Sequence, residues 1–446
     1  MSGDKEQEYF SEGLSEELLN SLSRINELQV AARTSSFSFV GEHPDIATVA
    51  HKLNVGAVLE GSVPRSAHTV RITAQLVNGV TGFHIWSDTY DRDLGDILKL
   101  QTEIATAVAS ALKLTLLRDA AEKIEVGGTR NPAAFDAYLR GMKGYFTVRD
   151  ARTDNPAAIA AFTDAIRLDP NYALAFAGRS LALTQFAGTF TSTEATGRQN
   201  LDQAIADARK AITLAPELAE GHLALAVVLT QSFDFAGASQ EYERALAIAP
   251  GSARMLRNAG AFAVKMGRTD SGIAAVTRAV ALDPLSVQAR VWRADSLYDA
   301  HHYHEAALAY EETISLFPDR QEGYLGRGFV YYIMGNFTEA RVSCEARTEN
   351  DGSTICLAMV YQRLGRHTDS EGMLSKLSAR YGDAAAYQYA VIYAQWGNTS
   401  QALGWLETAL RLRDSGLVYL KTDPLLDPLR NEPRFQAIEK ALKFPN

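Results

Sequence analysis

The chain has 446 residues, of which 46% are hydrophobic and 22% are charged, as in an ordinary folded protein. It carries 44 Lys and Arg against 53 Asp and Glu, a formal net charge of −9, which argues against a polyanionic nucleic acid as the main partner. No apolar run approaches the roughly 18 residues of a membrane span, and the acidic first residues lack the apolar core of a secretory signal. These features predict a cytoplasmic location.

The first 118 residues mix helical and strand-like segments. Leu18, Leu22 and Ile25 share one face of a predicted helix, and Ser15 is its predicted N-cap. A short strand is predicted for LQVAAR and a second helix for DIATVAHKL. Three strand-like runs and a closing helix follow, in GAVLEGSV, TVRITAQLV, GFHIWSDTY and LGDILKLQTEIATAVASAL. This order predicts a small α+β layer whose middle strand alternates apolar and polar residues.

The central part of the chain repeats at a constant interval. Prolines stand at Pro216, Pro250, Pro284 and Pro318, so each follows the last at an interval of about 34 residues. Proline marks the end of a helix because it cannot continue one. Pro170 precedes Pro216 by a longer interval, and the loop-like stretch AGTFTSTEATGRQ accounts for the excess. Each unit contains two amphipathic helical segments that cannot bury their apolar faces alone, so the pairs are expected to stack into a solenoid.

Small residues recur where paired helices must approach, at Ala238 and Ala245 in one unit and at Gly272 and Ala279 in the next. This pattern resembles the tetratricopeptide repeat and covers residues 133 to 412, with a degenerate unit that has Gly352 in place of proline. The remaining residues 413–446 are predicted to cap the open apolar end of the solenoid. Their helix-breaking prolines and apolar residues are Pro424, Pro428, Pro433, Leu425, Leu426 and Leu429.

The segments SGDKEQEYFSEGLSEELLNSLSRINELQVAARTSSFSF, GAVLEGSV, VRITAQLVNGVTGFHIWSDTYDRDL and QTEIATAVASAL resemble the TolB amino-terminal-like domain. The resemblance implies an α+β domain over residues 1–118, joined by a linker at 119–132 to the all-α repeat solenoid at 133–412. Relatives place this domain ahead of tetratricopeptide repeats in bacterial signalling proteins and usually begin it with an apolar strand before SGD. We therefore expect Met1 to be internal to a longer protein and the sheet edge to be open to self-association.

The sequence shows no convergent catalytic, cofactor-binding or metal-binding motif, so we predict that the chain is not an enzyme. His301 and His304 are predicted to lie in a polar turn, because a metal site needs three or four convergent ligands. The acidic cluster at Asp88, Asp91, Asp93 and Asp96 lacks the spacing of a calcium loop. Cys344 and Cys356 are predicted to be buried small hydrophobic residues rather than a redox pair.

The resemblance to tetratricopeptide repeats also implies that the first helix of each pair lines a concave groove. Three consecutive units would then present a basic, an acidic and an apolar set of side chains. The predicted groove residues are Arg254, Arg257, Lys265, Asp295, Tyr298, Asp299, Leu325, Phe329 and Tyr332. Such a groove suits an extended peptide or a helix. The alternative is that the charges form a solvated surface and the aromatic residues pack between repeats.

We interpret the chain as a non-catalytic module for protein–protein interaction and regulation. Two alternatives follow from the family resemblance. In one, the chain is the regulatory part of an adenylate or guanylate cyclase or a protein kinase whose catalytic domain lies outside this sequence. In the other, it is the regulatory part of a winged-helix DNA-binding transcriptional regulator. A transmembrane helix often precedes this region in the family, which would make its location periplasmic.

Overall fold

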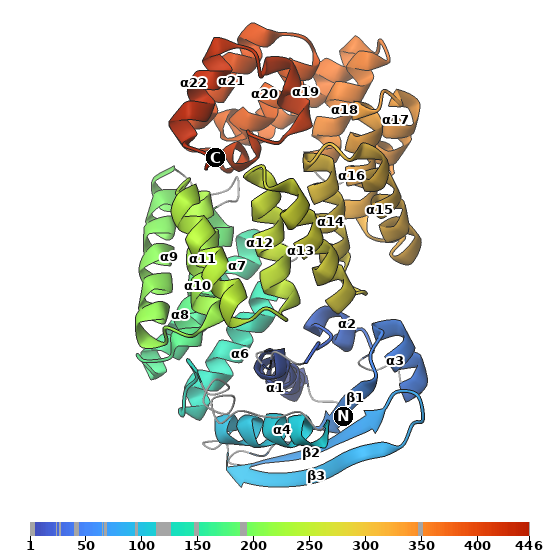
Figure 1. The fold of residues 1–446 in the computed structure, drawn as a ribbon. Helices are drawn as coiled ribbons and strands as arrows, with labels where there is room; N and C mark the ends of the chain where they lie inside the picture. Colours follow the sequence, from blue (N-terminus) through green and yellow to red (C-terminus); the bar gives the residue numbers. More distant parts are fainter. Residues whose placement is uncertain are drawn as a thin grey trace. The chain divides into compact units, whose positions relative to one another are not determined.

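The computed structural model describes residues 5–23, 25, 28–39, 44–64, 66, 69–93, 97–112, 126–146, 151–187, 194–346 and 351–445. The chain forms two compact units (Figure 1). Unit 1 comprises Met1–Ser232, Gly237–Leu256 and Ala281–Leu285, and unit 2 comprises Phe233–Ala236, Arg257–Val280 and Ser286–Asn446. Asp96 lies outside the described residues. Parts of the predicted linker and of the long loop before Pro216 lie outside them as well.

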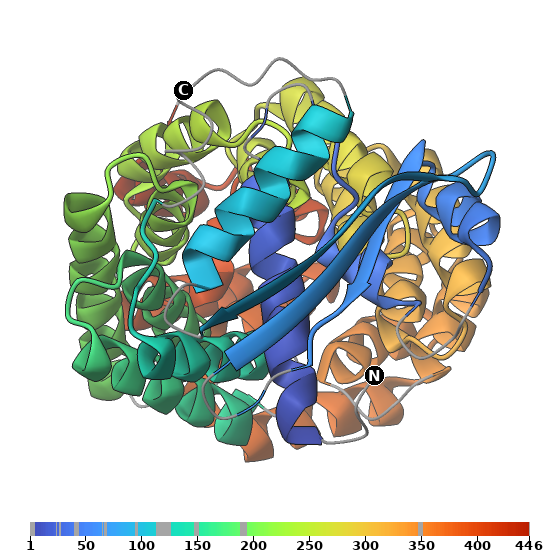
Figure 2. The same ribbon diagram turned by 90° about the horizontal axis from the view of Figure 1, so that it is seen from below.

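Unit 1 begins with a small α+β layer, as the sequence predicts. Its sheet contains β1 (Ala57–Ser62), β2 (Thr69–Asn78) and β3 (His84–Asp93), antiparallel in the order β1-β2-β3. The alternation along β2 is confirmed, because Val70, Ile72 and Leu76 are buried while Arg71 is exposed. Helices α1 (Lys5–Ser23) and α4 (Ile97–Ala111) lie against the same face of this sheet (Figures 1 and 2).

The shorter predicted elements of this layer have mixed outcomes. Helix α3 (Ile46–Leu53) is confirmed, and the Asp45 side chain caps it by accepting a 2.8 Å hydrogen bond from the Thr48 N–H. The predicted N-cap at Ser15 is wrong, because Ser15 lies inside α1 and donates its hydroxyl to the Ser11 carbonyl at 2.8 Å. The predicted strand LQVAAR is also wrong. Its Ala32 N–H donates to the Leu282 carbonyl at 2.8 Å, outside the sheet, and α2 (Arg33–Phe37) begins directly after it.

The rest of the chain consists of paired helices that form the repeat solenoid. In unit 1 these are α6 (Pro132–Phe146), α7 (Ala151–Leu168), α8 (Ala173–Ala187), α9 (Glu194–Leu214), α10 (Ala219–Gln231) and most of α11 (Phe235–Ile248). In unit 2 they are α14 (Val287–Asp299), α15 (Tyr303–Leu316), α16 (Gln321–Ile333), α17 (Phe337–Glu345), α18 (Asp351–Arg363), α19 (His367–Tyr381), α20 (Ala386–Gln395) and α21 (Thr399–Leu412). Helices α12 (Ala253–Lys265) and α13 (Thr269–Leu282) belong mainly to unit 2.

The constant repeat interval is confirmed by the helix bounds. The first helices α10, α12, α14 and α16 begin at Ala219, Ala253, Val287 and Gln321, which reproduces the spacing of the prolines. The same interval would start the next first helix at Ile355, but α18 begins earlier, at Asp351. The degenerate unit is therefore four residues shorter than its predecessors.

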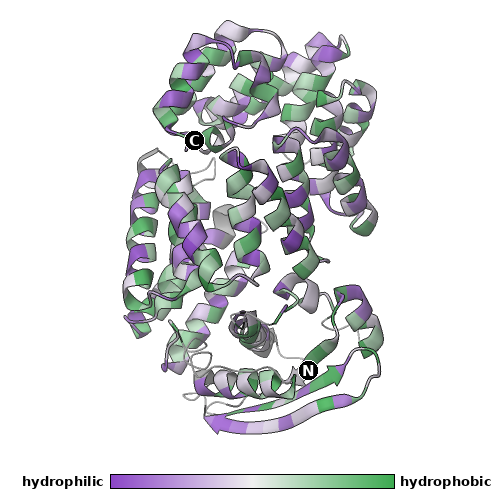
Figure 3. Cartoon of the chain, in the orientation of Figure 1, coloured by the Kyte–Doolittle hydropathy of each residue, from purple (hydrophilic) through white to green (hydrophobic). Residues whose placement is uncertain are grey.

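The small residues of the repeats lie at tight helix contacts, as predicted. Ala238, Ala245 and Ala279 are at most 1% exposed. A methyl group on Gly272 would lie 2.5 Å from Val264 Cγ2 and 2.6 Å from the Gly260 carbonyl oxygen, too close for any side chain. Hydrophilic and hydrophobic residues are interspersed along the helices, as expected of amphipathic pairs (Figure 3).

One continuous hydrophobic core joins the α+β layer to the first repeats within unit 1. Phe10 of α1 meets Phe135 of α6 edge to face, with ring centroids 6.2 Å apart. Ile72 of the sheet and Ile104 of α4 belong to the same core. Helix α1 is thus packed on both the sheet layer and the solenoid.

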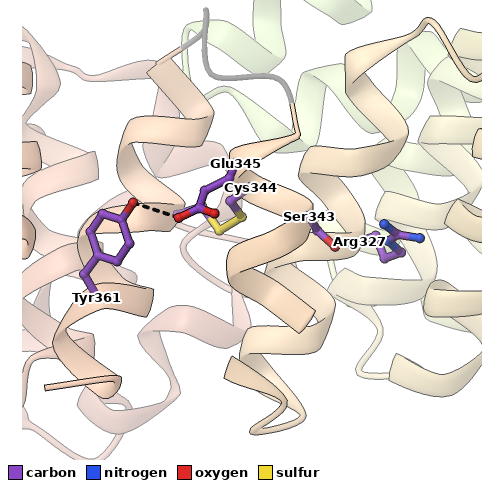
Figure 4. Close-up of a disulfide and its surroundings, with 6 residues drawn as sticks. Arg327, Ser343, Cys344, Glu345 and Tyr361 are labelled. Carbon is purple, nitrogen blue, oxygen red and sulfur yellow. Dashed lines mark hydrogen bonds between the residues drawn. A yellow bond between two sulfur atoms is a disulfide. The ribbon is translucent and has the colours of Figure 1, made fainter. Parts of the chain in front are cut away.

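A disulfide joins Cys344 of α17 to Cys356 of α18, and this corrects the prediction of two separate buried thiols (Figure 4). Cys344 lies near the end of α17 and Cys356 lies in α18, and their two Cα atoms are 6.2 Å apart, within the usual range for a disulfide. Both cysteines are fully buried. Beside them, the Tyr361 hydroxyl donates to Glu345 Oε1 at 3.0 Å. The disulfide therefore spans the shortened junction.

The C-terminal residues form two short 3₁₀ turns and a final helix, η3 (Ser415–Tyr419), η4 (Pro424–Leu429) and α22 (Pro433–Leu442). A third 3₁₀ turn, η2 (Gly382–Ala385), precedes α20. Pro424 and Pro433 stand at the first positions of their elements, where the missing N–H group costs no helical hydrogen bond. Leu425, Leu426 and Leu429 are buried.

Candidate partner-binding grooves

The nine predicted groove residues all lie on first helices of the repeats, but they do not belong to one unit. Arg254 belongs to unit 1, and the other eight belong to unit 2. On α12 lie Arg254, Arg257 and Lys265; on α14 lie Asp295, Tyr298 and Asp299; on α16 lie Leu325, Phe329 and Tyr332. Arg254 in unit 1 and Lys265 in unit 2 each contact another segment of the same unit.

In unit 1 the first helices of the repeats hold α1. The space between them is only about 10 Å³, too small for a peptide. Its lining residues are Asn20 of α1 together with Tyr138, Met142, Leu174, Ala177, Gly178, Leu181, Glu220 and Arg254. Helix α1 therefore occupies this inner face in the way that an amphipathic helix fills a hydrophobic groove.

The docked face of α1 carries two buried carboxyl groups, Glu16 and Glu17, each 6% exposed. Glu17 Oε1 accepts a 3.0 Å hydrogen bond from the Tyr138 hydroxyl of α6. Glu16 lies 3.1 Å from Arg33 Nε. Burial raises the pKa of Glu16 to about 7, although Arg33 and Arg254 oppose this rise by attraction to its charged form.

Arg254 itself stacks on aromatic residues of α6. Its guanidinium carbon lies 5.3 Å from the ring centroid of Phe146 and 5.6 Å from that of Tyr145. The Arg254 side chain therefore interacts with the rings of Tyr145 and Phe146 and with the Glu16 carboxyl group, all within unit 1.

In unit 2 the C-terminal segment returns to the helices that begin the unit. Lys265 Nζ lies 4.0 Å above the ring centroid of Tyr419. Lys421 Nζ donates to the Met266 carbonyl at 3.1 Å and to the Pro445 carbonyl at 3.0 Å. The C-terminal segment thus contacts residues far earlier in the chain.

The same segment brings a third carboxyl group to a pair of buried ones. Burial raises the pKa of Asp299 to about 8 and that of Asp295 to about 6, while attraction to Lys265 opposes both shifts. Asp423 raises the pKa of Asp299 further by charge repulsion. Burial also raises the pKa of Asp423, which accepts a 2.8 Å hydrogen bond from the Tyr387 hydroxyl. Lys265 is the cation that stabilises the charged forms of Asp295 and Asp299.

The remaining predicted groove residues of unit 2 have other surroundings. Arg257 places its guanidinium carbon 5.0 Å from the Trp292 ring. Tyr332 is 3% exposed, packs 5.5 Å from the Phe337 ring and accepts a hydrogen bond from Arg363 Nε at 3.2 Å. Leu325 and Phe329 are half-buried. For Tyr332 the structure thus favours packing between repeats, the alternative left open by the sequence.

Sequence reasoning missed the residues that occupy the unit 2 groove, namely Tyr419, Lys421 and Asp423. Their signal was a lysine and an aspartate inside an otherwise apolar C-terminal stretch.

His301, predicted to lie in a polar turn, has a positive φ of 63° between α14 and α15, and its Nε2 lies 3.0 Å from Asp427 Oδ2.

A separate cleft of about 440 Å³ lies between α19, α20 and α21. Its lining residues are Leu374, Ser375, Ser378, Ala379, Tyr389, Tyr393 and Trp405, none of which carries a charge at neutral pH. Tyr389 and Trp405 form its aromatic wall, with ring centroids 4.7 Å apart.

Two further classes of site were sought across the described residues. No group of three or more His, Cys, Asp or Glu side chains there is arranged to hold a metal ion. Within the same ranges, no helix is both long and apolar enough to cross a membrane.

Comparison with known proteins identifies the repeats. The family model described as Tetratricopeptide repeat matches residues 193–253, 263–300 and 293–350. The solenoid therefore contains tetratricopeptide repeats over these residues. A crystal structure of a tetratricopeptide repeat protein from Parabacteroides merdae is 17% identical, covers 59% of this chain and 99% of its own, and has a TM-score of 0.42. Yeast Tom70 is 13% identical, with coverage of 78% and 82% and a TM-score of 0.44.

One curated relative matches over a longer stretch than any single match to the family model. This protein, named Putative adenylate cyclase 3, comes from Rhizobium meliloti (strain 1021) and is 36% identical over 231 residues. The match covers 52% of this chain and 38% of the relative. The chain therefore corresponds to well under half of that protein's length.

Proposed function

We propose that the chain is a non-catalytic scaffold that binds a protein partner through its tetratricopeptide repeats. The observation that carries this proposal is the inner face of unit 2, where the first helices hold a segment of the chain itself that consists of the short 3₁₀ turns η3 and η4 and the residues that connect them. The Lys265 ammonium group lies above the Tyr419 ring of that segment, and the Asp423 carboxylate of the segment raises the pKa of Asp299. A surface that accommodates one such segment has the geometry to bind another peptide.

The proposed partner site in unit 2 comprises Arg257, Lys265, Asp295, Tyr298, Asp299, Leu325 and Phe329, and it excludes Tyr332, which packs between repeats. Arg254 belongs to the corresponding surface in unit 1, which α1 covers. Half-buried Leu325 and Phe329 provide apolar contacts of the kind that anchor peptides in repeat grooves.

We further infer that this scaffold is the regulatory part of a nucleotide cyclase. The name of the Rhizobium meliloti relative favours this reading over a kinase or a winged-helix regulator. The α+β layer, which resembles the TolB amino-terminal-like domain, and the attached repeats provide the regulatory portion of such a protein. Purified chain should then show no cyclase turnover by itself, and turnover that survives controls for contaminants would contradict the proposal.

We also propose a periplasmic rather than a cytoplasmic location. Disulfides persist in oxidising compartments and are rare in the cytoplasm, and Cys344 and Cys356 are joined and fully buried. Cells lysed into denaturant together with an alkylating reagent should yield a chain in which neither cysteine is modified, because unfolding exposes both residues and only the disulfide then protects them. Alkylation of both cysteines would favour the cytoplasm.

The scaffold proposal is tested by placing a photo-crosslinking amino acid at Phe329 in cells. A matched control is Leu308 of α15 in the same unit, a large apolar residue that is 65% exposed. We expect a discrete crosslinked protein from position 329 and none from position 308. Equal crosslinking at both positions, or none at position 329, would contradict a partner site on the inner face.

A further inference from the structure

Each repeat of a solenoid normally contacts only its neighbours. The segment 415–431, here named the tail segment, departs from this rule within unit 2. It packs on α20 and α21, yet Tyr419 and Lys421 contact Lys265 and Met266 at the start of the unit. The tail segment therefore spans the inner face from the last helix pair to α12.

The tail segment is held in the way that a groove holds a peptide. Gln395 Nε2 of α20 donates to the Leu425 carbonyl at 2.5 Å. The Tyr387 hydroxyl of the same helix donates to the Asp423 carboxylate at 2.8 Å. Leu426 and Leu429, which follow these polar contacts in the chain, are fully buried. Backbone recognition combined with buried apolar anchors is typical of peptide binding.

Docking of the tail segment also carries an electrostatic cost. Asp423 repels the charged form of Asp299. Lys265 attracts Asp299 and its neighbour Asp295, whereas the cation that attracts Asp423 is Arg430 of the tail segment itself. The hydroxyl groups of Tyr310 and Tyr387 donate to two of these carboxyl groups but supply no positive charge. Leucine burial therefore favours the docked segment, while carboxylate repulsion opposes it.

We propose that the tail segment is an exchangeable occupant of the unit 2 groove, and that a partner segment with leucines flanked by short polar residues binds there by displacing it. This inference rests on the proposed scaffold function and specifies how its site is regulated. The resident sequence TDPLLDPL defines the chemistry of the competing peptide: apolar anchors, turn-forming prolines and a hydrogen-bond acceptor at the position of Asp423.

Two variants shift the docked population in opposite directions. Lys421→Met removes the hydrogen bonds to the Met266 and Pro445 carbonyls and should open the tail segment. Asp423→Asn removes one negative charge, its amide oxygen can still accept from the Leu425 N–H, and its NH2 group can donate to the Tyr387 hydroxyl, so the docked form of the segment should become more populated. Lys440→Met on α22 is the matched control, because Lys440 is exposed and lies outside the tail segment.

The experiment measures binding of a fluorescent synthetic peptide of residues 415–431 to the full chain. Apparent affinity scales with the open fraction, so we expect roughly tenfold tighter binding to Lys421→Met and roughly tenfold weaker binding to Asp423→Asn than to the unmodified chain. Lys440→Met should match the unmodified chain. Identical affinity for all four proteins would overturn the proposal.

Trypsin digestion of the unmodified chain gives a second measurement that does not depend on any variant folding. An exchangeable tail segment should be cut after Lys421 well before α18 is cut after Arg363. Simultaneous cleavage at both would show that the segment opens only with the whole unit and would overturn the proposal. Crosslinking at position 329 tests the scaffold function independently, because it reports a partner whether or not the tail segment moves.

Discussion

The inner faces of the two units are both filled by segments of the same chain, but the segments differ in kind. In unit 1 the occupant is a regular helix, α1, whose backbone groups bond to one another. In unit 2 it is the irregular tail segment, whose carbonyl at Leu425 relies on Gln395 of the solenoid. The first occupant needs only complementary side chains, whereas the second also needs polar partners for its backbone.

The charged groups at the two faces differ as well. Glu16 of α1 lies beside Arg33 and is attracted to Arg254, and these two cations of unit 1 oppose the rise of its pKa on burial. Asp423 of the tail segment is attracted to Arg430 within the segment itself, and it repels the charged form of Asp299 on α14. This difference indicates that α1 is a permanent part of unit 1 and that the tail segment is the more readily displaced occupant.

The largest expected effect concerns the disulfide of unit 2, a feature that we do not find among the described residues of unit 1. Reduction should destabilise unit 2 by about 3 kcal/mol, because the bridge closes a loop with a sequence separation of 12. Thermal melts with and without reductant measure the loss. The double variant Cys344→Ala/Cys356→Ala should be insensitive to reductant, and a reductant-sensitive melt of that variant would contradict the assignment.

Overpacking a helix contact should have the next largest effect in either unit. Ala245→Trp in unit 1 and Ala279→Trp in unit 2 place a large ring where the alanine is at most 1% exposed. We expect each to cost about 1–3 kcal/mol or more in denaturant unfolding. Arg278→Trp, at an exposed position next to Ala279, is the control and should cost far less. Equal losses at positions 278 and 279 would refute the contact assignment.

The two faces should also differ in their dependence on pH. A carboxyl group whose pKa is raised by folding keeps its proton in the folded state after the unfolded state has lost it, so stability falls as pH rises between the two values. For Glu16 this window runs from 4.5 to about 7, and for Asp299 from 3.8 to about 8. Unit 2 should therefore continue to lose stability between pH 7 and 8, after unit 1 has stopped.

Denaturant unfolding from pH 5 to 9, followed by a probe in each unit, measures this difference. Asp299→Asn should flatten the unit 2 profile, and Glu16→Gln should flatten that of unit 1. Asp295, Asp423 and Lys265 face Asp299 and remain in the first variant, so a residual slope below pH 6 is expected from Asp295. A profile that rises with pH in both units would contradict the buried-carboxyl account.

The smallest expected effect is the loss of the Tyr419 ring beneath Lys265. Tyr419 is 40% exposed, so Tyr419→Leu should cost only about 0.5–1 kcal/mol. The same substitution in the variant Lys265→Met should cost less, because the ammonium partner is already absent. A double-mutant cycle measures the coupling, and zero coupling would remove this contact from the account.

The features predicted from sequence are those with a local, periodic signal. The evenly spaced prolines located the helix pairs, and the alternation along β2 located the buried face of the sheet. LQVAAR failed because a short apolar run does not distinguish a strand from an extended connection. Ser15 failed because α1 begins well before it.

The features that sequence did not reveal depend on distant contacts. The Cys344–Cys356 pairing depends on how α17 packs against α18, which the sequence alone does not give. The groove residues were placed correctly on the first helices, but their neighbours were not predictable. Nothing local to Lys421 indicates that its ammonium group reaches the Met266 carbonyl.

The central claim is that α1 is a fixed occupant and the tail segment an exchangeable one. Native-state hydrogen exchange measured by mass spectrometry tests it directly, because each segment reports its own opening free energy. The account predicts that amides of residues 415–431 exchange faster than those of α18 and α20, while amides of α1 exchange no faster than those of α6. Exchange of the tail segment only together with α18 and α20, or exchange of α1 ahead of α6, would contradict it.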